Sequence, residues 1–116
     1  MKYLILLNDP PYGTERSYNG LRLANSLARN DATSLSVFLM GDAASCAVSG
    51  QTTPNGYYNL ERMLKFVASK GHRVGVCGSC MDARGIKPEA LIDGAHRSSM
   101  DELTEWTQAA DRVIVF

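Results

Sequence analysis

Two cysteines in the second half of the chain give the sequence its clearest chemical signal. Cys77 stands at the end of an apolar run, and Cys80 follows it with two residues between them. In a Cys-x-x-Cys pair one sulfur can attack or stabilise the other, which suits sulfur transfer and disulfide chemistry. Zinc would need two more ligands, and the candidates Cys46, His72 and His96 show no second paired spacing. We therefore expect neither a metal nor another cofactor.

The position of Cys77 favours a reactive thiol. A predicted strand at 72–76 ends just before it, a helix is expected to begin just after it, and Arg84 lies further along that helix. A free cysteine with a pKa of about 8.5 is only about 3% thiolate at pH 7. A helix terminus contributes about 0.3–1 kcal/mol, up to about 2, in favour of an anion. A pKa lowered by about one unit raises the thiolate fraction to about a quarter. The alternative, a small buried residue that ends a strand, stays open at this point.

Other residues have both a structural and a functional interpretation. Cys46 lies in a run of small residues, which favours a packed thiol, and Trp106 shares a helix face with apolar residues, which favours packing. Asp42 follows a predicted strand, so it either caps the next turn or lines the site beside Cys77. The loop at 10–13 lacks the glycine pattern of a phosphate cradle, so nucleotide binding has weak support.

Alternating strands and helices position these residues. Short apolar runs predict strands at 3–8, 34–40, 72–76, 95–98 and 112–116. Apolar spacing predicts helices at 14–30, 60–70 and 99–110, the last opened by a capping box of Ser99 and Glu102, and shorter helices at 81–84 and 88–92. This order predicts an α/β fold in which helices cover both faces of a parallel sheet. Functional groups in such sheets gather at the carboxyl ends of the strands, here the loops at 9–13, 41–46 and 77–80.

Length and charge narrow the function classes. The 116 residues fit one domain, residues 1–116. The net charge is +0 and no basic stripe is present, so we expect no nucleic acid as a partner. The N-terminal apolar run is shorter than a signal-peptide core, and no stretch approaches the ~20 apolar residues of a membrane span. Three cysteines do not make a disulfide framework, so we expect a cytoplasmic protein with no membrane partner.

The segment around the two cysteines resembles a known family. The run VCGSCMDARGI at 76–86 is similar to the DsrE/DsrF family, which includes the TusD sulfur-relay subunit. Members carry a cysteine after the third strand, then a short helix that ends in Arg-Gly and an aliphatic residue. Shorter similarities at 3–10, 21–27, 37–42 and 110–116 extend the resemblance over nearly the whole chain.

The resemblance implies a YchN-like, three-layer α/β/α fold with a parallel five-stranded sheet, and symmetric homotrimers or homohexamers. Cys77 falls where the family carries its persulfide. Cys80 is not present in every relay member, which leaves open whether this chain passes sulfur on or forms an internal disulfide. Residues near this cysteine are candidates for binding the sulfur substrate: Asp42, Gly78, Ser79 and Arg84.

The leading hypothesis is a sulfur carrier that accepts sulfane sulfur on Cys77 and passes it to an acceptor thiol. Its partners would be a protein or small-molecule sulfur donor and acceptor. The rivals are a thiol–disulfide redox protein that uses Cys77 and Cys80, and a non-catalytic oligomeric module that binds a small ligand. Large apolar residues near element ends predict self-association: Met40, Tyr57, Tyr58, Trp106 and Phe116.

Overall fold

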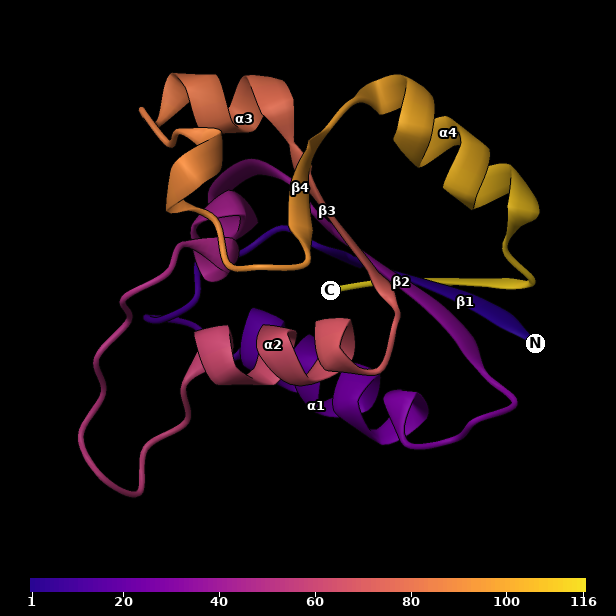
Figure 1. Ribbon diagram of the computed structural model, residues 1–116, viewed down its shortest axis with the longest axis horizontal. Helices are drawn as coiled ribbons and strands as arrows, with labels where there is room; N and C mark the ends of the chain where they lie inside the picture. Colours follow the sequence, from indigo (N-terminus) through magenta and orange to yellow (C-terminus); the bar gives the residue numbers. More distant parts are fainter.

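The computed structural model describes residues 1–116 and contains a five-stranded sheet with the order β4-β3-β2-β1-β5 (Figure 1). The strands are β1 (Lys2–Leu7), β2 (Ser34–Leu39), β3 (Arg73–Cys77), β4 (Ala95–Ser98) and β5 (Arg112–Val115). The helices are α1 (Arg16–Ala28), α2 (Leu60–Ser69), α3 (Gly78–Ala83) and α4 (Met100–Ala109), with the 3₁₀ helices η1 (Gly41–Ala47) and η2 (Pro88–Ala90).

The layers follow the predicted α/β/α arrangement. All neighbouring strands run parallel, so their carboxyl ends meet at one edge of the sheet. In Figure 1, α1 and α2 lie on one side of the sheet and α4 lies on the other. The connections η1 and α3 lie at the carboxyl-end edge, directly after β2 and β3. The fold therefore brings the segments that follow β2 and β3 side by side.

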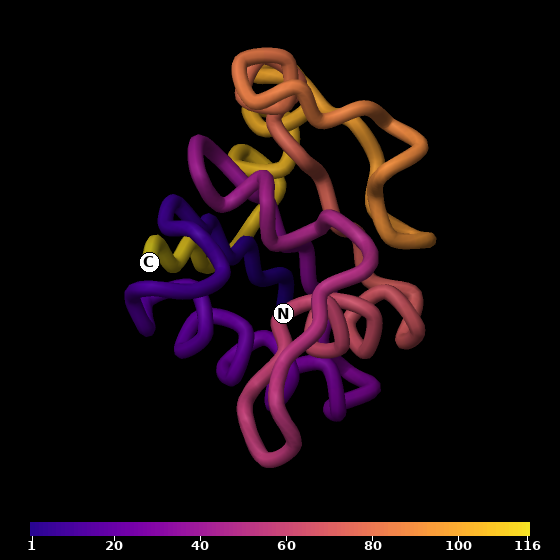
Figure 2. Tube along the Cα trace, turned by 90° about the vertical axis from the view of Figure 1, so that its left-hand side faces the viewer, coloured from indigo at the N-terminus to yellow at the C-terminus, as the bar shows by residue number.

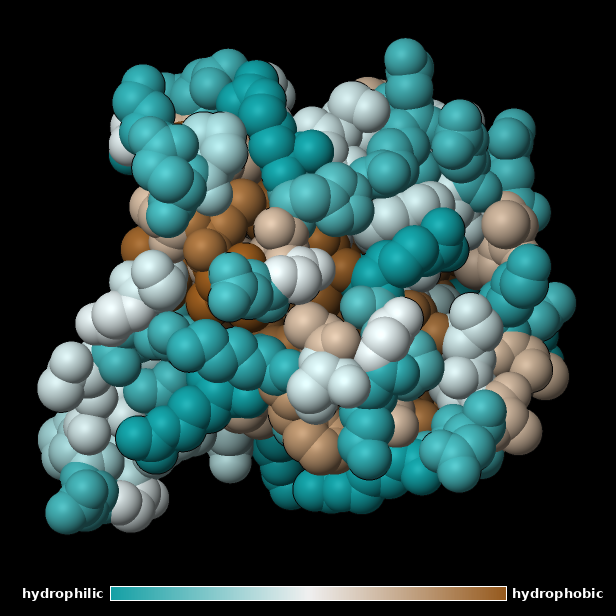
Figure 3. All heavy atoms as spheres, in the orientation of Figure 1, coloured by the Kyte–Doolittle hydropathy of each residue, from teal (hydrophilic) through white to brown (hydrophobic).

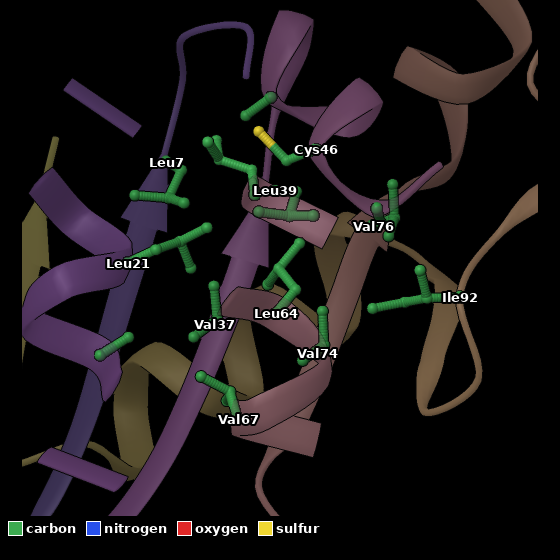
Figure 4. Packing of buried hydrophobic residues seen from close by; sticks show 14 of the residues in the cluster. Leu7, Leu21, Val37, Leu39, Cys46, Leu64, Val67, Val74, Val76 and Ile92 are labelled. Carbon is green, nitrogen blue, oxygen red and sulfur yellow. The ribbon is translucent and has the colours of Figure 1, made fainter. Parts of the chain in front are cut away.

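Most of the core lies between the sheet and the pair α1 and α2. Inward side chains of the central strands, including Val37, Leu39 and Val74, meet Leu64 and Val67 from α2 (Figure 4). All five side chains have 0% exposure. Each such burial contributes about 1.5–3 kcal/mol relative to an exposed side chain. This packing fixes the position of β3, and with it the base of the segment that carries the cysteines.

The opposite face of the sheet has a much smaller core. Leu103 and Trp106 of α4 pack on Leu4 and Phe38 of the sheet, and these four residues form the whole buried cluster. The rings of Phe38 and Trp106 meet edge-on with 6.1 Å between their centroids. Trp106 is 4% exposed, which confirms that it packs in the core. Its predicted place among the uncovered apolar residues is therefore wrong.

α4 leaves part of this second face uncovered. Val113 and Val115 of β5 are 43% and 59% exposed, and Met100 at the start of α4 is 63% exposed. Among the residues that the sequence singled out, Tyr57 is exposed, while Met40 is half-buried. The strands on this face therefore carry apolar side chains that the monomer does not bury.

Two helix starts follow the predicted cap residues. The Asn59 side chain accepts a hydrogen bond from the backbone of α2, and Ser99 accepts one of 3.1 Å from the Glu102 N–H. The reciprocal half of the predicted capping box is missing, because the Glu102 carboxylate is bound by Ser98 and His96 instead. The small-residue segment 41–47 and the short helix expected at 88–92 are both 3₁₀ helices, and the second spans only 88–90.

The outer surface differs between the two ends of the molecule. The loop at 48–59 projects from the body, and α3 lies on the opposite side from it (Figures 1 and 2). Hydrophobic residues gather in a hollow between α3 and α2, while the outward surfaces of the helices are mostly hydrophilic (Figure 3). No helix has both the length and the apolar character needed to cross a membrane.

Candidate functional site

Cys77 lies at the edge of the sheet where the strands end. It is the last residue of β3 and the N-cap of α3, so this helix begins at Gly78 and not at the predicted residue 81. Its sulfur accepts a hydrogen bond of 3.4 Å from the Cys80 N–H and lies 3.4 Å from the Ser79 hydroxyl oxygen. The side chain is half-buried beside the small core cluster under α4. Two polar groups of α3, the Cys80 N–H and the Ser79 hydroxyl, therefore contact a sulfur that also packs beside apolar side chains.

A pocket of about 270 Å³ opens beside Cys77, between the ends of β2, β3 and β4 and the start of α4. Phe38, Met40 and Met100 give it an apolar wall, and Ser79 adds a hydroxyl group. Larger and more open hollows of about 560 Å³ between α1 and α2 and about 410 Å³ beside the end of α2 are lined by no cysteine. The pocket at Cys77 is therefore the one that joins a thiol to a space for a small ligand.

Gly78 lets α3 approach β4 closely. A Cβ on this residue would lie 2.8 Å from the Ser98 carbonyl oxygen and 2.9 Å from Cζ of Arg97. Arg97 donates to the Gly78 carbonyl at 3.0 Å and binds both carboxylate oxygens of Asp82, at 2.7 and 2.9 Å. The hydrogen bonds from Arg97 lower the pKa of the Asp82 carboxyl. Gly78, predicted to bind substrate, thus lines the pocket and also fixes α3 against the sheet.

Cys80 approaches Cys77 from the other side. The two form a disulfide with 5.2 Å between their Cα atoms. The Gly41 N–H, from the segment after β2, donates to the Cys80 sulfur at 3.1 Å. Cys80 packs against the large core cluster, whereas Cys77 packs beside the small one. The pair therefore joins the two faces of the sheet at its carboxyl-end edge.

Asp42 and Arg84 lie together, and neither lines the pocket beside Cys77. The Arg84 guanidinium binds Asp42 Oδ1 at 2.7 Å and the Cys80 carbonyl oxygen at 3.0 Å. The Arg84 guanidinium makes no hydrogen bond to the Cys77 sulfur and does not line the pocket. The capping interpretation of Asp42 is wrong, because the N-cap of η1 is Met40, with no side-chain hydrogen bond. The ion pair instead fastens η1 to the end of α3.

A second polar group beside the pocket was not found from the sequence. Ser98 pairs with Cys77 across β3 and β4, and its hydroxyl donates to Glu102 Oε1 at 2.5 Å. His96 contacts the same carboxylate. Burial opposes ionisation of Glu102, but the hydrogen bonds from Ser98 and His96 outweigh it and lower the pKa of this carboxyl. The pairing of β3 with β4 could have indicated Ser98, because residues opposite each other on neighbouring strands point to the same face of the sheet.

Cys46 is a packed thiol, as the sequence predicted. It has 0% exposure, and burial raises the pKa of its thiol to about 12. Of the loops expected at the strand ends, 41–46 and 77–80 meet through Gly41 and Cys80. The loop at 9–13 meets the 41–46 loop through the Asp9 carbonyl oxygen, which lies 3.8 Å from the Cys46 sulfur, and Tyr12 donates to Gln51 of the 48–59 loop at 2.6 Å. No group of three His, Cys, Asp or Glu side chains could hold a metal ion.

The whole chain, residues 1–116, matches the profile of the DsrE/DsrF-like family. The chain belongs to this family. It is 39% identical to the YchN protein of Escherichia coli over 116 residues, which covers 99% of this chain and 98% of that one. A relative from Methanocaldococcus jannaschii, itself uncharacterised, is 34% identical over the full length of both chains.

The structural comparison gives the same result for the fold of this DsrE/DsrF-like protein. The crystal structure of E. coli YchN superposes with a TM-score of 0.94 at 38% identity and covers 100% of this chain and 99% of that one. A protein of unknown function from Methanobacterium thermoautotrophicum superposes with a TM-score of 0.73 at 12% identity, covering 99% and 98%, and is similar in fold alone. The YchN-like fold expected from the sequence is confirmed.

Proposed function

We propose that this DsrE/DsrF-like protein is a sulfur carrier, in which Cys77 accepts sulfane sulfur as a persulfide and passes it to an acceptor thiol. The observation that carries the proposal is the environment of the Cys77 sulfur. It lines a pocket of about 270 Å³ and is contacted by the Cys80 N–H and the Ser79 hydroxyl, each at 3.4 Å. Hydrogen bonds to the charged form of a thiol favour the thiolate, which is the nucleophile in sulfur exchange.

The transfer consists of two exchange steps. The Cys77 thiolate attacks the sulfane sulfur of a polysulfide or persulfide donor. The new bond to Sγ forms while the bond between that sulfur and the departing donor thiolate breaks. An acceptor thiolate then attacks the outer sulfur, and Cys77 leaves as a thiolate. The pocket beside Cys77 is large enough for a small thiol and lies at the surface, where a donor or acceptor can enter it.

A second candidate function has one specific observation in its favour. Cys77 and Cys80 are paired as a disulfide, which also suits a thiol–disulfide redox protein. The two functions differ in their need for Cys80. A carrier variant without Cys80 still gains sulfur at Cys77, whereas a redox protein without Cys80 loses its disulfide cycle and needs no persulfide at any stage.

We also propose that the protein assembles as a homotrimer or homohexamer. Leu6 pairs with Val115 on one side and with Phe38 on the other, so an apolar row crosses this face of the sheet from the exposed Val115 to Phe38, which α4 covers. The row continues toward the pocket, where Met40 and Cys77 pack beside the same small cluster. A neighbouring copy on this face would cover both the row and the opening of the pocket. The number of copies rests on the resemblance to the family.

Peptide mapping after exposure to polysulfide tests the carrier function. Reduced Cys80→Ser protein is expected to gain one sulfur atom on the peptide that contains Cys77, because Cys46 is buried and its pKa is raised to about 12. The matched control is Cys77→Ser. If that control gained the same sulfur on Cys80 or Cys46, the assignment to Cys77 would be wrong.

A further inference from the structure

The two paired sulfurs have different surroundings. Cys77 lines the pocket, while Cys80 is not among the lining residues and packs against the large core cluster. Their Cα atoms are 5.2 Å apart, and the structure joins them as a disulfide. The Cys77 sulfur therefore faces the pocket, and the Cys80 sulfur contacts it from the side of the large core cluster.

The Cys80 sulfur accepts a hydrogen bond from a backbone amide of a different segment. The donor is the Gly41 N–H, at 3.1 Å. Gly41 has φ +59, in the left-handed region that favours glycine. The next residue, Asp42, binds Arg84 at 2.7 Å, and Arg84 donates to the Cys80 carbonyl oxygen at 3.0 Å. The segment after β2 is thus connected to Cys80 in two ways, directly through the Gly41 N–H and indirectly through Asp42 and Arg84.

We propose that Cys80 is a resolving thiol that discharges the Cys77 persulfide as hydrosulfide when no external acceptor takes the sulfur. This inference rests on the proposed function, since it needs a persulfide at Cys77. The Gly41 N–H stabilises the Cys80 thiolate, and the Asp42–Arg84 ion pair positions that N–H. Asp42 and Arg84 are therefore positioning residues and do not touch the sulfur that is transferred.

The step is a thiol–disulfide exchange within the chain. The Cys80 thiolate attacks Sγ of Cys77, the inner sulfur of the persulfide, which is the atom it contacts in the structure. The Cys77–Cys80 bond forms, the bond from Sγ to the outer sulfur breaks, and the outer sulfur leaves as HS⁻ with the electron pair. Two thiols of an external dithiol reductant then reduce the disulfide and are themselves oxidised to a disulfide. Cys80 would thus limit the lifetime of the loaded carrier.

The experiment follows sulfide release after loading. Reduced protein, freed of reductant, receives one equivalent of glutathione persulfide, and released sulfide is trapped with monobromobimane while the protein mass is recorded. Wild type is expected to release close to one equivalent of sulfide and to lose two hydrogen atoms as its disulfide forms. The Cys80→Ser variant is expected to keep the added sulfur.

The outcomes separate this inference from the carrier function. If the wild-type persulfide lasted as long as that of Cys80→Ser, the resolving role would be overturned while the carrier function stood. If neither protein gained sulfur, the carrier function itself would be refuted, and the inference with it.

A pair of matched variants tests the positioning role. Asp42→Asn breaks the ion pair that holds the Gly41 segment to α3, and Asp82→Asn breaks the other ion pair of α3, with Arg97. We expect Asp42→Asn to slow sulfide release by about two- to fivefold, the range that an exposed ion pair supports. The rate of sulfur loading onto Cys77 is expected to stay unchanged. Equal sulfide-release rates in the two variants would overturn the role assigned to Gly41 and Asp42.

Discussion

Selective alkylation of the reduced protein tests how strongly the fold separates its thiols. The Cys46 side chain has 0% exposure, and burial raises the pKa of its thiol to about 12. At pH 8 about one Cys46 side chain in ten thousand is then ionised, against about a quarter of free cysteine with a pKa of about 8.5. Ionisation alone therefore makes Cys46 about 2,000-fold slower than a free thiol, since the thiolate is the nucleophile.

The assay is iodoacetamide labelling of reduced protein, quantified for each cysteine peptide by mass spectrometry from pH 7 to pH 10. Cys77, half-buried at the pocket, is expected to react at least as fast as free cysteine. The rate at Cys46 is expected to rise about tenfold for each pH unit over the whole range. Comparable rates at the two residues at pH 8, in protein whose circular dichroism shows it to be folded, would refute the assignment of Cys46 as a packed thiol and Cys77 as the accessible one.

Three further outcomes are expected. The free energies of unfolding of wild type and Cys46→Ala are compared by urea titration at a series of pH values. Because the pKa of Cys46 is higher in the folded state, the wild-type value is expected to fall, relative to the variant, by about 1.4 kcal/mol per pH unit between pH 9.0 and pH 12, with no such fall below pH 9.0. A constant difference between wild type and variant over this range would contradict the prediction. Gly78→Ala is expected to lower the free energy of unfolding by about 1–3 kcal/mol, because the new Cβ would lie 2.8 Å from the Ser98 carbonyl oxygen. The control Ser79→Ala changes an exposed side chain and is expected to alter this free energy by less than about 0.5 kcal/mol. Val115→Asp is expected to reduce the mass measured by light scattering to that of the 12.6 kDa monomer, and a wild-type protein that is itself 12.6 kDa would refute the assembly.

The strand and helix pattern was predictable because local sequence signals and tertiary packing agree. The apolar run before Cys77 forms β3, and the caps at Asn59 and Ser99 start α2 and α4 where expected. The start of α3 was missed because its N-cap is a cysteine. Sulfur is not one of the usual cap groups, so the pattern placed the first turn too late.

The partners of the charged side chains could not be predicted, because they depend on contacts between distant segments. Arg84 is near Cys77 in sequence, yet it binds Asp42, which lies 42 positions away. The amide of Gly41 has no side chain to suggest its role, although it donates to the Cys80 sulfur. Only the juxtaposition of the segments after β2 and β3 brings these groups together.

The most direct test of the carrier function follows one sulfur atom into and out of the protein. The intact mass of reduced Cys80→Ser is recorded before polysulfide, after polysulfide and its removal, and after addition of glutathione as acceptor thiol. The sulfur-carrier account predicts a gain of one sulfur mass that then disappears as glutathione persulfide forms. A Cys80→Ser protein that gains no sulfur, or a Cys77→Ser protein that gains and returns sulfur equally well, would contradict it.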